Sequence, residues 1–469
     1  MTIDALPDNV LLEIFDLYLD LDVDDLDTLL ILFGLHEEDA WHTLVHVCST
    51  WRRLVFASPR RLNLRLLCRN TRPVMKTLNV WPELPIIIDA HIANPRRPGT
   101  TNIIYALKQH DRVYRIDITW SPNSLLKKIA AIKKPFPALT YLWLSSSDEN
   151  PVVLPSSFLG GSVPRLQKLY LDRIPFPALG KLLSSTRNLV TLHLYSIPRS
   201  GYISPKAIVA CISALTRLKQ LFLKFKYPLS RTEWRNRYPP PLTRVVLPAL
   251  TKLEFKGNSE YLEDIVSWID TPQLCDVEIK FFNQLVFDTP HLSHFIGRIE
   301  QFMAFHRATT LFGRFVHIRF SSQDRISMLR VRIVCESLDW QLPSLTQIFH
   351  WFPPPLHALE HLRICDAQQP SPQFQDDIPE NTQWLEFLHQ FTSIRDLELT
   401  KKFIPLVFPS LGDLTGERVA EVLPALQNII VEEFPSLGPV QEAVDKFVAS
   451  RRLFGCPVAV RQRETERWW

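Results

Sequence analysis

The stretch Leu166-Gln167-Lys168-Leu169-Tyr170-Leu171 contains the pattern that decides the fold of this chain. Apolar residues at its first, fourth and sixth positions give the motif L-x-x-L-x-L. Its second half alternates apolar and outward-facing residues, which is typical of a β-strand with one buried face. Nine further copies of the motif follow the same pattern. They begin at Val113, Leu139, Leu189, Leu218, Leu250, Leu274, Leu359, Ile394 and Leu426.

The spacing of these copies is that of a repeat protein. In the first seven copies the middle apolar positions are 23 to 32 residues apart. A period of 20–29 residues with this core is typical of a leucine-rich repeat, and longer gaps indicate loop insertions. Helix-like segments lie between the copies, at residues 103–109, 124–133, 176–184 and 205–214. We therefore expect an α/β fold in which residues 61–469 form an irregular solenoid, with a parallel sheet on its concave face and helices on its convex face.

Proline precedes several copies of the motif by two residues. We expect these prolines at the first residue of a strand, where proline is tolerated. They are Pro137, Pro164, Pro248, Pro272 and Pro424. The copies are interrupted by an irregular stretch between Ile279 and Leu359, and a polar, proline-rich segment from Cys365 to Thr382 predicts a surface loop.

Residues 1–60 have a different character and predict a helical module. Leu6-Pro7 precedes an apolar stripe that includes Val10, Leu11 and Ile14, and proline is favoured at the first position of a helix. A second stripe extends from Leu44 to Val55. Two helices this short cannot bury both stripes between themselves, so we expect them to pack on a third element, part of which can belong to another protein.

The order Leu6-Pro7, followed by Val47-Cys48-x-x-Trp51-Arg52, resembles the F-box, the short module that docks a protein onto the Skp adaptor of a cullin–RING ubiquitin ligase. The resemblance implies a non-enzymatic, substrate-recruiting subunit of an SCF-type ligase, with the Skp adaptor and through it cullin as partners. It implies that the adaptor-facing or box-core residues are Leu6, Pro7, Val10, Leu11, Ile14, Leu44, Val47, Cys48 and Trp51. The repeats lack the Asn that usually follows the core of a leucine-rich repeat. With these repeats and the F-box-like segment, the chain resembles the irregular F-box proteins expanded in mushroom-forming fungi.

One departure from the F-box pattern is an acidic insertion at residues 19–39, where the family usually has a short turn. Its centre, Leu29-Leu30-Ile31-Leu32-Phe33, is apolar and predicts a short packed helix at residues 27–33. The acidic residues around it are typical of a solvated loop.

The composition argues against several classes of function. Glycine makes up 13 of 469 residues, about 3% against a usual ~7%, which disfavours glycine-rich phosphate loops. The sequence has no G-x-S-x-G, P-loop or G-x-G-x-x-G motif, and its seven cysteines form no C-x-x-C pair. We therefore expect no enzyme activity, no catalytic residues, no cofactor and no metal site. Without a packed basic run or an apolar run of about 18 residues, we also expect no nucleic-acid partner, no membrane span, and a cytoplasmic or nuclear location.

The repeats also predict a surface for a protein substrate. Trp143, Tyr170, His193 and Phe222 occupy equivalent outward positions in four successive copies, so we expect an aromatic ladder on the concave face. Outward-facing lysines flank it: Lys168, Lys224, Lys252, Lys256 and Lys280. Aromatic anchors beside cations suit an acidic or phosphorylated peptide. A structural alternative is that aromatic residues simply favour strands and are covered by helices or loops.

Two functions remain open at this point. One is the adaptor-bound substrate receptor. The other is a repeat scaffold outside any ligase, whose F-box-like helices only cap the array, since terminal repeats need polar caps. A cap hides its apolar residues, whereas a docking module leaves an apolar patch exposed at Leu6, Pro7, Val10 and Leu11.

Overall fold

The structure is a computed structural model. It describes residues 6–19, 40–69, 74–81, 83–91, 100–228, 243–282, 289–313, 315–324, 327–334, 338–351, 358–366, 381–432 and 438–463. The chain forms two compact units. The first comprises Met1–Thr191 with Ser200–Tyr202, and the second comprises Leu192–Arg199 with Ile203–Trp469.

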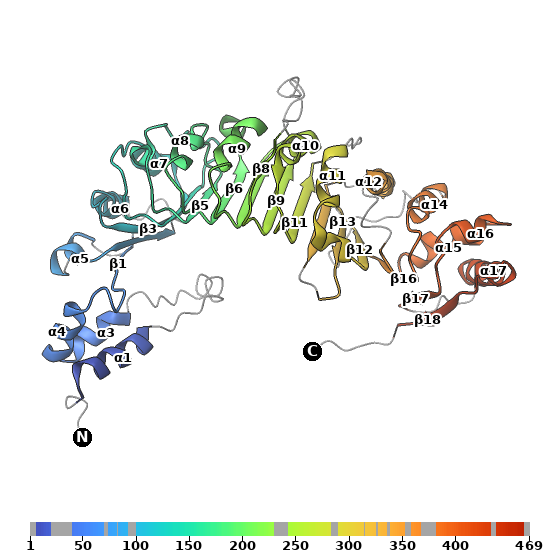
Figure 1. Ribbon diagram of the computed structural model, residues 1–469, viewed down its shortest axis with the longest axis horizontal. Helices are drawn as coiled ribbons and strands as arrows, with labels where there is room; N and C mark the ends of the chain where they lie inside the picture. Colours follow the sequence, from blue (N-terminus) through green and yellow to red (C-terminus); the bar gives the residue numbers. More distant parts are fainter. Residues whose placement is uncertain are drawn as a thin grey trace. The chain divides into compact units, whose positions relative to one another are not determined.

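Among the described residues, the first unit begins with three helices and continues as strands that alternate with helices (Figure 1). Its helices are α1 (Asp8–Leu19), α3 (Ala40–Val47), α4 (Ser49–Ala57), α5 (Val74–Val80), α6 (Thr100–Leu107), α7 (Asn123–Ala130), the 3-10 turn η3 (Phe158–Gly161) and α8 (Leu179–Leu183). Its strands are β1 (Leu66–Arg69), β2 (Ile86–His91), β3 (Val113–Ser121), β4 (Tyr141–Ser146) and β5 (Lys168–Asp172). Each strand pairs in parallel with the next along the chain.

The second unit repeats the alternation. Its strands are β6 (Thr191–Ile197), β7 (Gln220–Phe225), β8 (Val245–Val246), β9 (Lys252–Gly257), β10 (Ile269–Asp270), β11 (Asp276–Phe281), β12 (Arg307–Phe312), β13 (Val316–Ser321), β14 (Met328–Ile333), β15 (His361–Asp366), β16 (Asp396–Leu399), β17 (Asn428–Val431) and β18 (Ala459–Gln462). Its helices are α9 (Pro205–Ile212), α10 (Ser259–Trp268), α11 (Pro290–Gly297), η6 (Glu300–Ala304), α12 (Leu338–Trp351), α14 (Asn381–His389), α15 (Ile404–Gly412), α16 (Arg418–Glu421) and α17 (Pro439–Leu453). The 3-10 turn η4 (Arg199–Gly201) has residues in both units.

The predicted repeat is confirmed as alternating strands and helices, with one systematic difference. The four helix predictions correspond to α6, α7, α8 and α9 and agree with them within three residues at each end. In nine of the ten copies, however, the strand begins two residues after the first apolar position of the motif. That first residue is buried in the turn before the strand, as Leu139 and Leu166 show with no exposed surface.

This turn also corrects the expected place of the prolines. The amide of Leu139 donates to the Phe136 carbonyl, which makes Pro137 the second residue of a four-residue β-turn. The same hydrogen bond closes the turns at Pro164, Pro248, Pro272 and Pro424. Proline fits this position because its ring fixes φ near the value that the turn requires and its nitrogen has no hydrogen bond to donate. The prolines therefore form the turns that lead into the strands and lie outside the strands themselves.

The irregular stretch between Ile279 and Leu359 forms a three-stranded antiparallel meander within an otherwise parallel arrangement. The order along the sheet is β7-β9-β11-β14-β13-β12-β15-β16-β17-β18. β13 is antiparallel to both β14 and β12, while β14 is parallel to β11 and β12 is parallel to β15. After β11 the chain forms β12 with a gap of two strand positions between them. β13 and β14 then fill these two positions.

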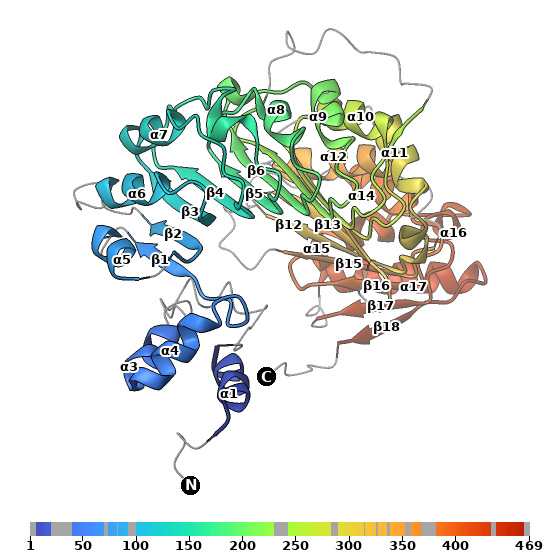
Figure 2. The ribbon, with the colours of Figure 1, turned by 60° about the vertical axis from the view of Figure 1, so that its left-hand side comes forward.

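Helices cover one face of the sheet in the second unit (Figure 2). Tyr261 of α10 shows the packing, because its ring lies 4.8 Å from that of Phe225 and 6.0 Å from that of Phe255, both buried strand residues. The other face is formed by the alternate strand residues, among them Phe222, Glu254 and Lys280, and we call it the helix-free face. The apolar motif positions therefore make the core, and the residues between them reach this second face.

Candidate functional site

The N-terminal helical module, residues 6–19 and 40–57, has its own small core. Leu11, Phe15, Leu44 and Trp51 are buried there, and the Phe15 and Trp51 ring centroids are 4.7 Å apart. Of the residues predicted to serve adaptor binding, Leu11, Leu44 and Trp51 are thus core residues. A substitution at Leu11 would therefore test the stability of the module before it tested docking.

The remaining predicted positions on α1 face outward. Val10 is 37% exposed, Ile14 38%, Leu17 73% and Tyr18 43%. These residues recur at i, i+4, i+7 and i+8 and therefore share one side of the helix. We call them the α1 stripe. Pro7 and Val47 are also exposed and Leu6 is half-buried, so apolar surface is present around the beginning of α1 and at the end of α3.

Cys48 has a local structural role. Its Sγ accepts a hydrogen bond of 3.4 Å from the Trp51 amide, so the cysteine caps the N-terminus of α4. The module is fixed to the chain that follows it by an aromatic cluster, in which Trp81 lies 5.1 Å from Trp41 and stacks on His42 at 4.9 Å. The helix predicted at residues 27–33, and the acidic insertion around it, lie outside the described residues.

Ring pairs lie at the positions predicted for the aromatic ladder, one pair in each unit. In the first unit Trp143 and Tyr170 are half-buried, with centroids 5.4 Å apart. In the second unit His193 and Phe222 stack at 3.7 Å with 5° between their planes, and each is only 6% exposed. Lys168, on β5, is exposed. His193 and Phe222 thus stack on each other and are largely buried. Trp143 and Tyr170 are the rings that retain accessible surface.

Burial keeps His193 neutral. Its Nε2 lies 3.2 Å from Gln220 Oε1, and the Tyr195 hydroxyl lies 3.0 Å from Nδ1. The tautomer protonated at Nε2 satisfies both, because Nε2–H then donates to the amide oxygen and Nδ1 accepts from the hydroxyl. Removal from water is the main reason that the pKa of His193 is lowered from 6.5 to about 4.

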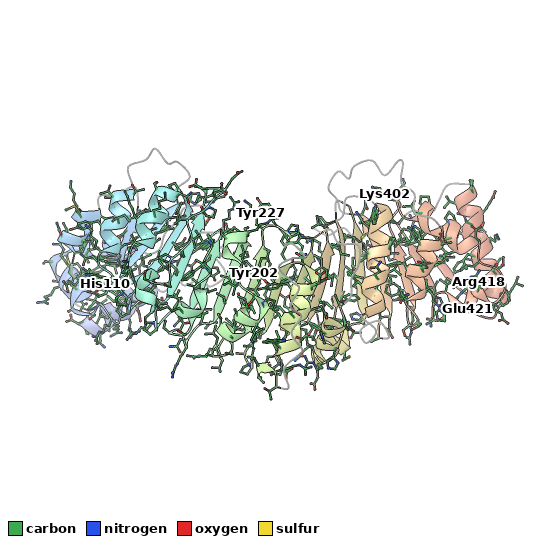
Figure 3. All side chains as sticks on the ribbon, turned by 90° about the horizontal axis from the view of Figure 1, so that it is seen from above. His110, Tyr202, Tyr227, Lys402, Arg418 and Glu421 are labelled. Carbon is green, nitrogen blue, oxygen red and sulfur yellow. The ribbon has the colours of Figure 1, made fainter. Side chains whose placement is uncertain are left out.

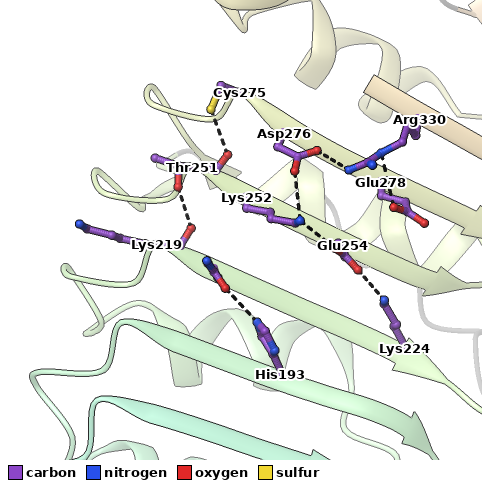
Figure 4. Close-up of polar contacts among 11 residues, drawn as sticks. His193, Lys219, Lys224, Thr251, Lys252, Glu254, Cys275, Asp276, Glu278 and Arg330 are labelled. Carbon is purple, nitrogen blue, oxygen red and sulfur yellow. Dashed lines mark hydrogen bonds and ion pairs between the residues drawn. The ribbon is translucent and has the colours of Figure 1, made fainter. Parts of the chain in front are cut away.

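Two of the predicted substrate-binding lysines are neutralised by carboxylates of neighbouring strands. Lys224 Nζ lies 2.5 Å from Glu254 Oε2, and Lys252 Nζ lies 3.2 Å from both Glu254 and Asp276. Burial alone would raise the pKa of Glu254, but its bonds to the two lysines outweigh that effect and lower it. Arg330 continues the series, at 2.7 Å from Asp276 and 3.4 Å from Glu278 (Figure 4).

A second set of basic residues on the same face has no such partner. Strand register places Lys224 beside Lys256, Lys256 beside Lys280, and Lys280 beside Arg332. Within the described residues, Lys256, Lys280 and Arg332 lie within 4.0 Å of no carboxylate. Burial, followed by the like charges of Lys256 and Arg332, lowers the pKa of Lys280. The pKa of Lys256 is lowered by burial and by Lys224. We call Lys256, Lys280 and Arg332 the basic row.

Some of the basic residues on this face lie outside the copies of the L-x-x-L-x-L motif. Arg330 and Arg332 lie on β14, and Arg319 lies on β13, both strands of the antiparallel meander. Their segments lack the L-x-x-L-x-L unit. They do show strict alternation, as in Met328-Leu329-Arg330-Val331-Arg332-Ile333, and that period would have predicted strands with outward-facing arginines.

Two hollows in the surface lie elsewhere. One of about 830 Å³ is lined by α17 and β18 residues, including Val444, Val448 and Val460. Another of about 470 Å³ is lined by residues of α12, α14 and α16, among them Arg418 and Glu421, which are labelled in Figure 3. In the described ranges no group of three His, Cys, Asp or Glu side chains is placed to hold a metal ion. Among those same residues, no helix is both long enough and apolar enough to cross a membrane.

These features define a mixed α/β protein with a largely parallel sheet built from leucine-rich-repeat-like units. No family model matches the chain, and no curated protein matches it. One solved structure that does match is the leucine-rich repeat-containing protein LegL7 from Legionella pneumophila, with 11% identity over 82% of this chain and 96% of that chain, at a TM-score of 0.27. A likeness this distant carries no argument, so the repeat character of the chain rests on its motifs, turns and strand register.

Proposed function

We propose that this protein is a substrate-recruiting subunit of an SCF-type cullin–RING ubiquitin ligase. On this proposal the N-terminal helical module acts as an F-box that docks a Skp adaptor, and the helix-free face of the repeats binds a protein substrate. The F-box resemblance of Leu6-Pro7 and Val47-Cys48-x-x-Trp51-Arg52 suggests the class. Transfer of ubiquitin belongs to the partner proteins.

The α1 stripe is the observation that carries the proposal. Four large apolar side chains on one side of a twelve-residue helix are exposed, while Leu11, Leu12 and Phe15 of the same helix are buried. A helix that only capped the array would turn its apolar residues inward and present polar ones to water. Contiguous exposed apolar surface instead marks an interaction site, because leaving it in water forfeits the free energy of its burial.

Substitution of the stripe tests adaptor docking directly. Ile14→Asp places a carboxylate in an apolar contact without touching the buried core of the module, and we expect it to weaken adaptor binding by about 2–3 kcal/mol, roughly a hundredfold in Kd. The measurement is titration of the full chain with a purified Skp-type adaptor. Leu453→Asp, an equally drastic change at an 86% exposed residue at the end of α17, is the matched control and should bind as the parent does.

Two results would contradict the proposal. If Ile14→Asp remains folded and binds the adaptor with unchanged affinity, the stripe is not the docking surface. If the unmodified chain itself does not bind any Skp-type adaptor, the scaffold alternative is favoured.

The proposed substrate surface has a separate test. Trp143 and Tyr170 are the accessible rings, whereas Phe222 is buried against His193. Replacing both accessible rings by alanine should therefore abolish recovery of co-purifying substrates while adaptor binding persists.

A further inference from the structure

Charge is unevenly distributed on the helix-free face of β7, β9, β11, β14 and β13. The outward positions of these five strands carry seven Lys or Arg side chains and three carboxylates. The basic residues are Lys224, Lys252, Lys256, Lys280, Arg319, Arg330 and Arg332. The acidic residues are Glu254, Asp276 and Glu278.

All three carboxylates are already occupied. Glu254 is shared by Lys224 and Lys252, Asp276 by Lys252 and Arg330, and Glu278 is bonded by Arg330. Lys256, Lys280, Arg332 and Arg319 are thus left, within the described part of the chain, without a carboxylate inside 4.0 Å. Lys256, Lys280 and Arg332 lie next to one another in register, and Arg319 lies beside Arg330.

The fold holds these charges together against their mutual repulsion. Neighbouring strands are about 4.8 Å apart, so the three members of the basic row span roughly 10 Å. The Lys256 ammonium lies 5.3 Å from the Phe282 ring centroid, and the Arg332 guanidinium lies 4.5 Å from that of Phe315, contacts that hold both cations near the sheet. His317 follows Arg332 in register, and burial, together with Arg332, Arg319 and Arg330, lowers its pKa to about 3. The histidine is therefore neutral and adds no further positive charge.

We propose that the basic row, with Arg319 beside it, binds a phosphorylated side chain of the protein substrate. This inference rests on the proposed function in that it names the chemistry of the substrate. A phosphate dianion offers several acceptor oxygens to ammonium and guanidinium donors, and it supplies the negative charge that the row lacks.

The dimensions favour a compact anion over a nucleic acid. An extended phosphodiester chain needs basic residues along several nucleotides. Here the three members of the row span only roughly 10 Å, and the adjacent outward positions on β9 and β11 hold Glu254 and Glu278, which add no positive charge to extend the row.

Lys280 gives the sharpest test, because it is the central member of the row. The probe is a degenerate nonapeptide library with phosphoserine at its centre, compared with the same library carrying serine, and binding to the full chain is measured by fluorescence polarisation. We expect at least tenfold preference for the phosphorylated library and loss of that preference in Lys280→Gln. Lys219→Gln removes the same charge from an exposed position in the turn before β7 and should bind as the parent does.

The stability of the same variant separates binding from a structural role. Because Lys280 is held among like charges, removing its charge relieves repulsion, and Lys280→Gln should melt at the parent's temperature or above it. A variant that loses both binding and stability would indicate a structural lysine and overturn the proposal. Equal binding of both libraries would overturn it as well, and so would a single-stranded oligonucleotide that displaces the phosphopeptides at equal concentration.

The outcome is independent of adaptor docking. Lys280→Gln should bind a Skp-type adaptor with the parent's affinity, since the residue lies in the second unit and the α1 stripe in the first. If the parent chain binds the phosphopeptides but does not bind the adaptor, the proposed role in a ubiquitin ligase is contradicted and the proposed phosphate site is not.

Discussion

At the scale of single residues, Arg451 of α17 shows how one side chain can join several segments. It has no exposed surface, and it donates to the carbonyls of Val419, Val422, Leu423, Leu426 and Cys456 at 2.9–3.5 Å. These carbonyls belong to α16, to the turn before β17 and to the segment before β18. The planar guanidinium can serve all of them because its five N–H donors spread in a fork.

Removal of this guanidinium should destabilise the end of the second unit. Arg451→Met preserves much of the side-chain volume and leaves five buried carbonyls without that donor, so we expect the free energy of unfolding to fall by about 3 kcal/mol. Arg452→Met, at the exposed next residue, should change it by less than about 0.5 kcal/mol. Urea unfolding together with hydrogen exchange at β17 measures both; protection of the β17 amides that is equal in the two variants would refute this account.

At the scale of elements, α10 and α11 are joined by a cap that one helix supplies to the other. Thr289 precedes α11 and forms no side-chain cap. The buried carboxylate of Glu263, on α10, instead accepts hydrogen bonds from the amides of His291 at 2.9 Å and Leu292 at 2.7 Å. The negative charge also lies at the positive end of the α11 dipole. Glu263 thus stabilises the beginning of a helix 28 residues further along the chain.

Loss of this cap should loosen α11 more than α10. We expect Glu263→Ala to cost about 1–2 kcal/mol, and Glu263→Gln to cost less because one acceptor oxygen remains. Hydrogen exchange of α11 amides is the measurement, with Glu300→Gln at an exposed residue as the control. Uniform loss of protection over both helices would mean that the carboxylate serves the packing as a whole.

At the scale of the whole molecule, two buried histidines link stability to pH. The pKa of His193 is lowered to about 4 and that of His317 to about 3, in both cases mainly because burial disfavours the charged form. The unfolded chain therefore takes up protons below about pH 6.5 while the folded chain does not. By linkage, the free energy of unfolding falls as the pH drops from 6.5 towards 4 and then 3.

A variant without one of these histidines should lose less stability in acid. Each pKa unit corresponds to about 1.4 kcal/mol, so between pH 7 and pH 4 the stability of His193→Gln should fall by about 3 kcal/mol less than that of the parent. Chemical denaturation at a series of pH values gives the comparison, and His294→Gln, at an exposed residue of α11, is the control. Parallel curves for the parent and His193→Gln would show that other groups dominate the acid response.

Much of this architecture could be predicted from the sequence, because its repeats are local patterns. The alternation around Leu142, Leu169 and Leu221 predicts strands, and a proline two residues before a motif fits the turn that leads into one. The strand starts were predicted at the prolines, four residues too early, since the burial of Leu139 gave no sign of whether a turn or a strand buried it. The meander was missed because its segments lack the L-x-x-L-x-L unit, although they alternate as strands do.

The sequence by itself determined which residues are apolar, how they are spaced and therefore which side of each strand is buried. Only the tertiary structure decided which outward-facing charges are neutralised. Lys224, Lys252, Lys256 and Lys280 look equivalent in the sequence, yet two are paired with carboxylates from adjacent strands and two are not. The same holds for α1, where Leu11 is buried and Ile14 is exposed. The physical reason is that ion pairing and burial depend on distances between segments far apart in the chain, which local periodicity does not specify.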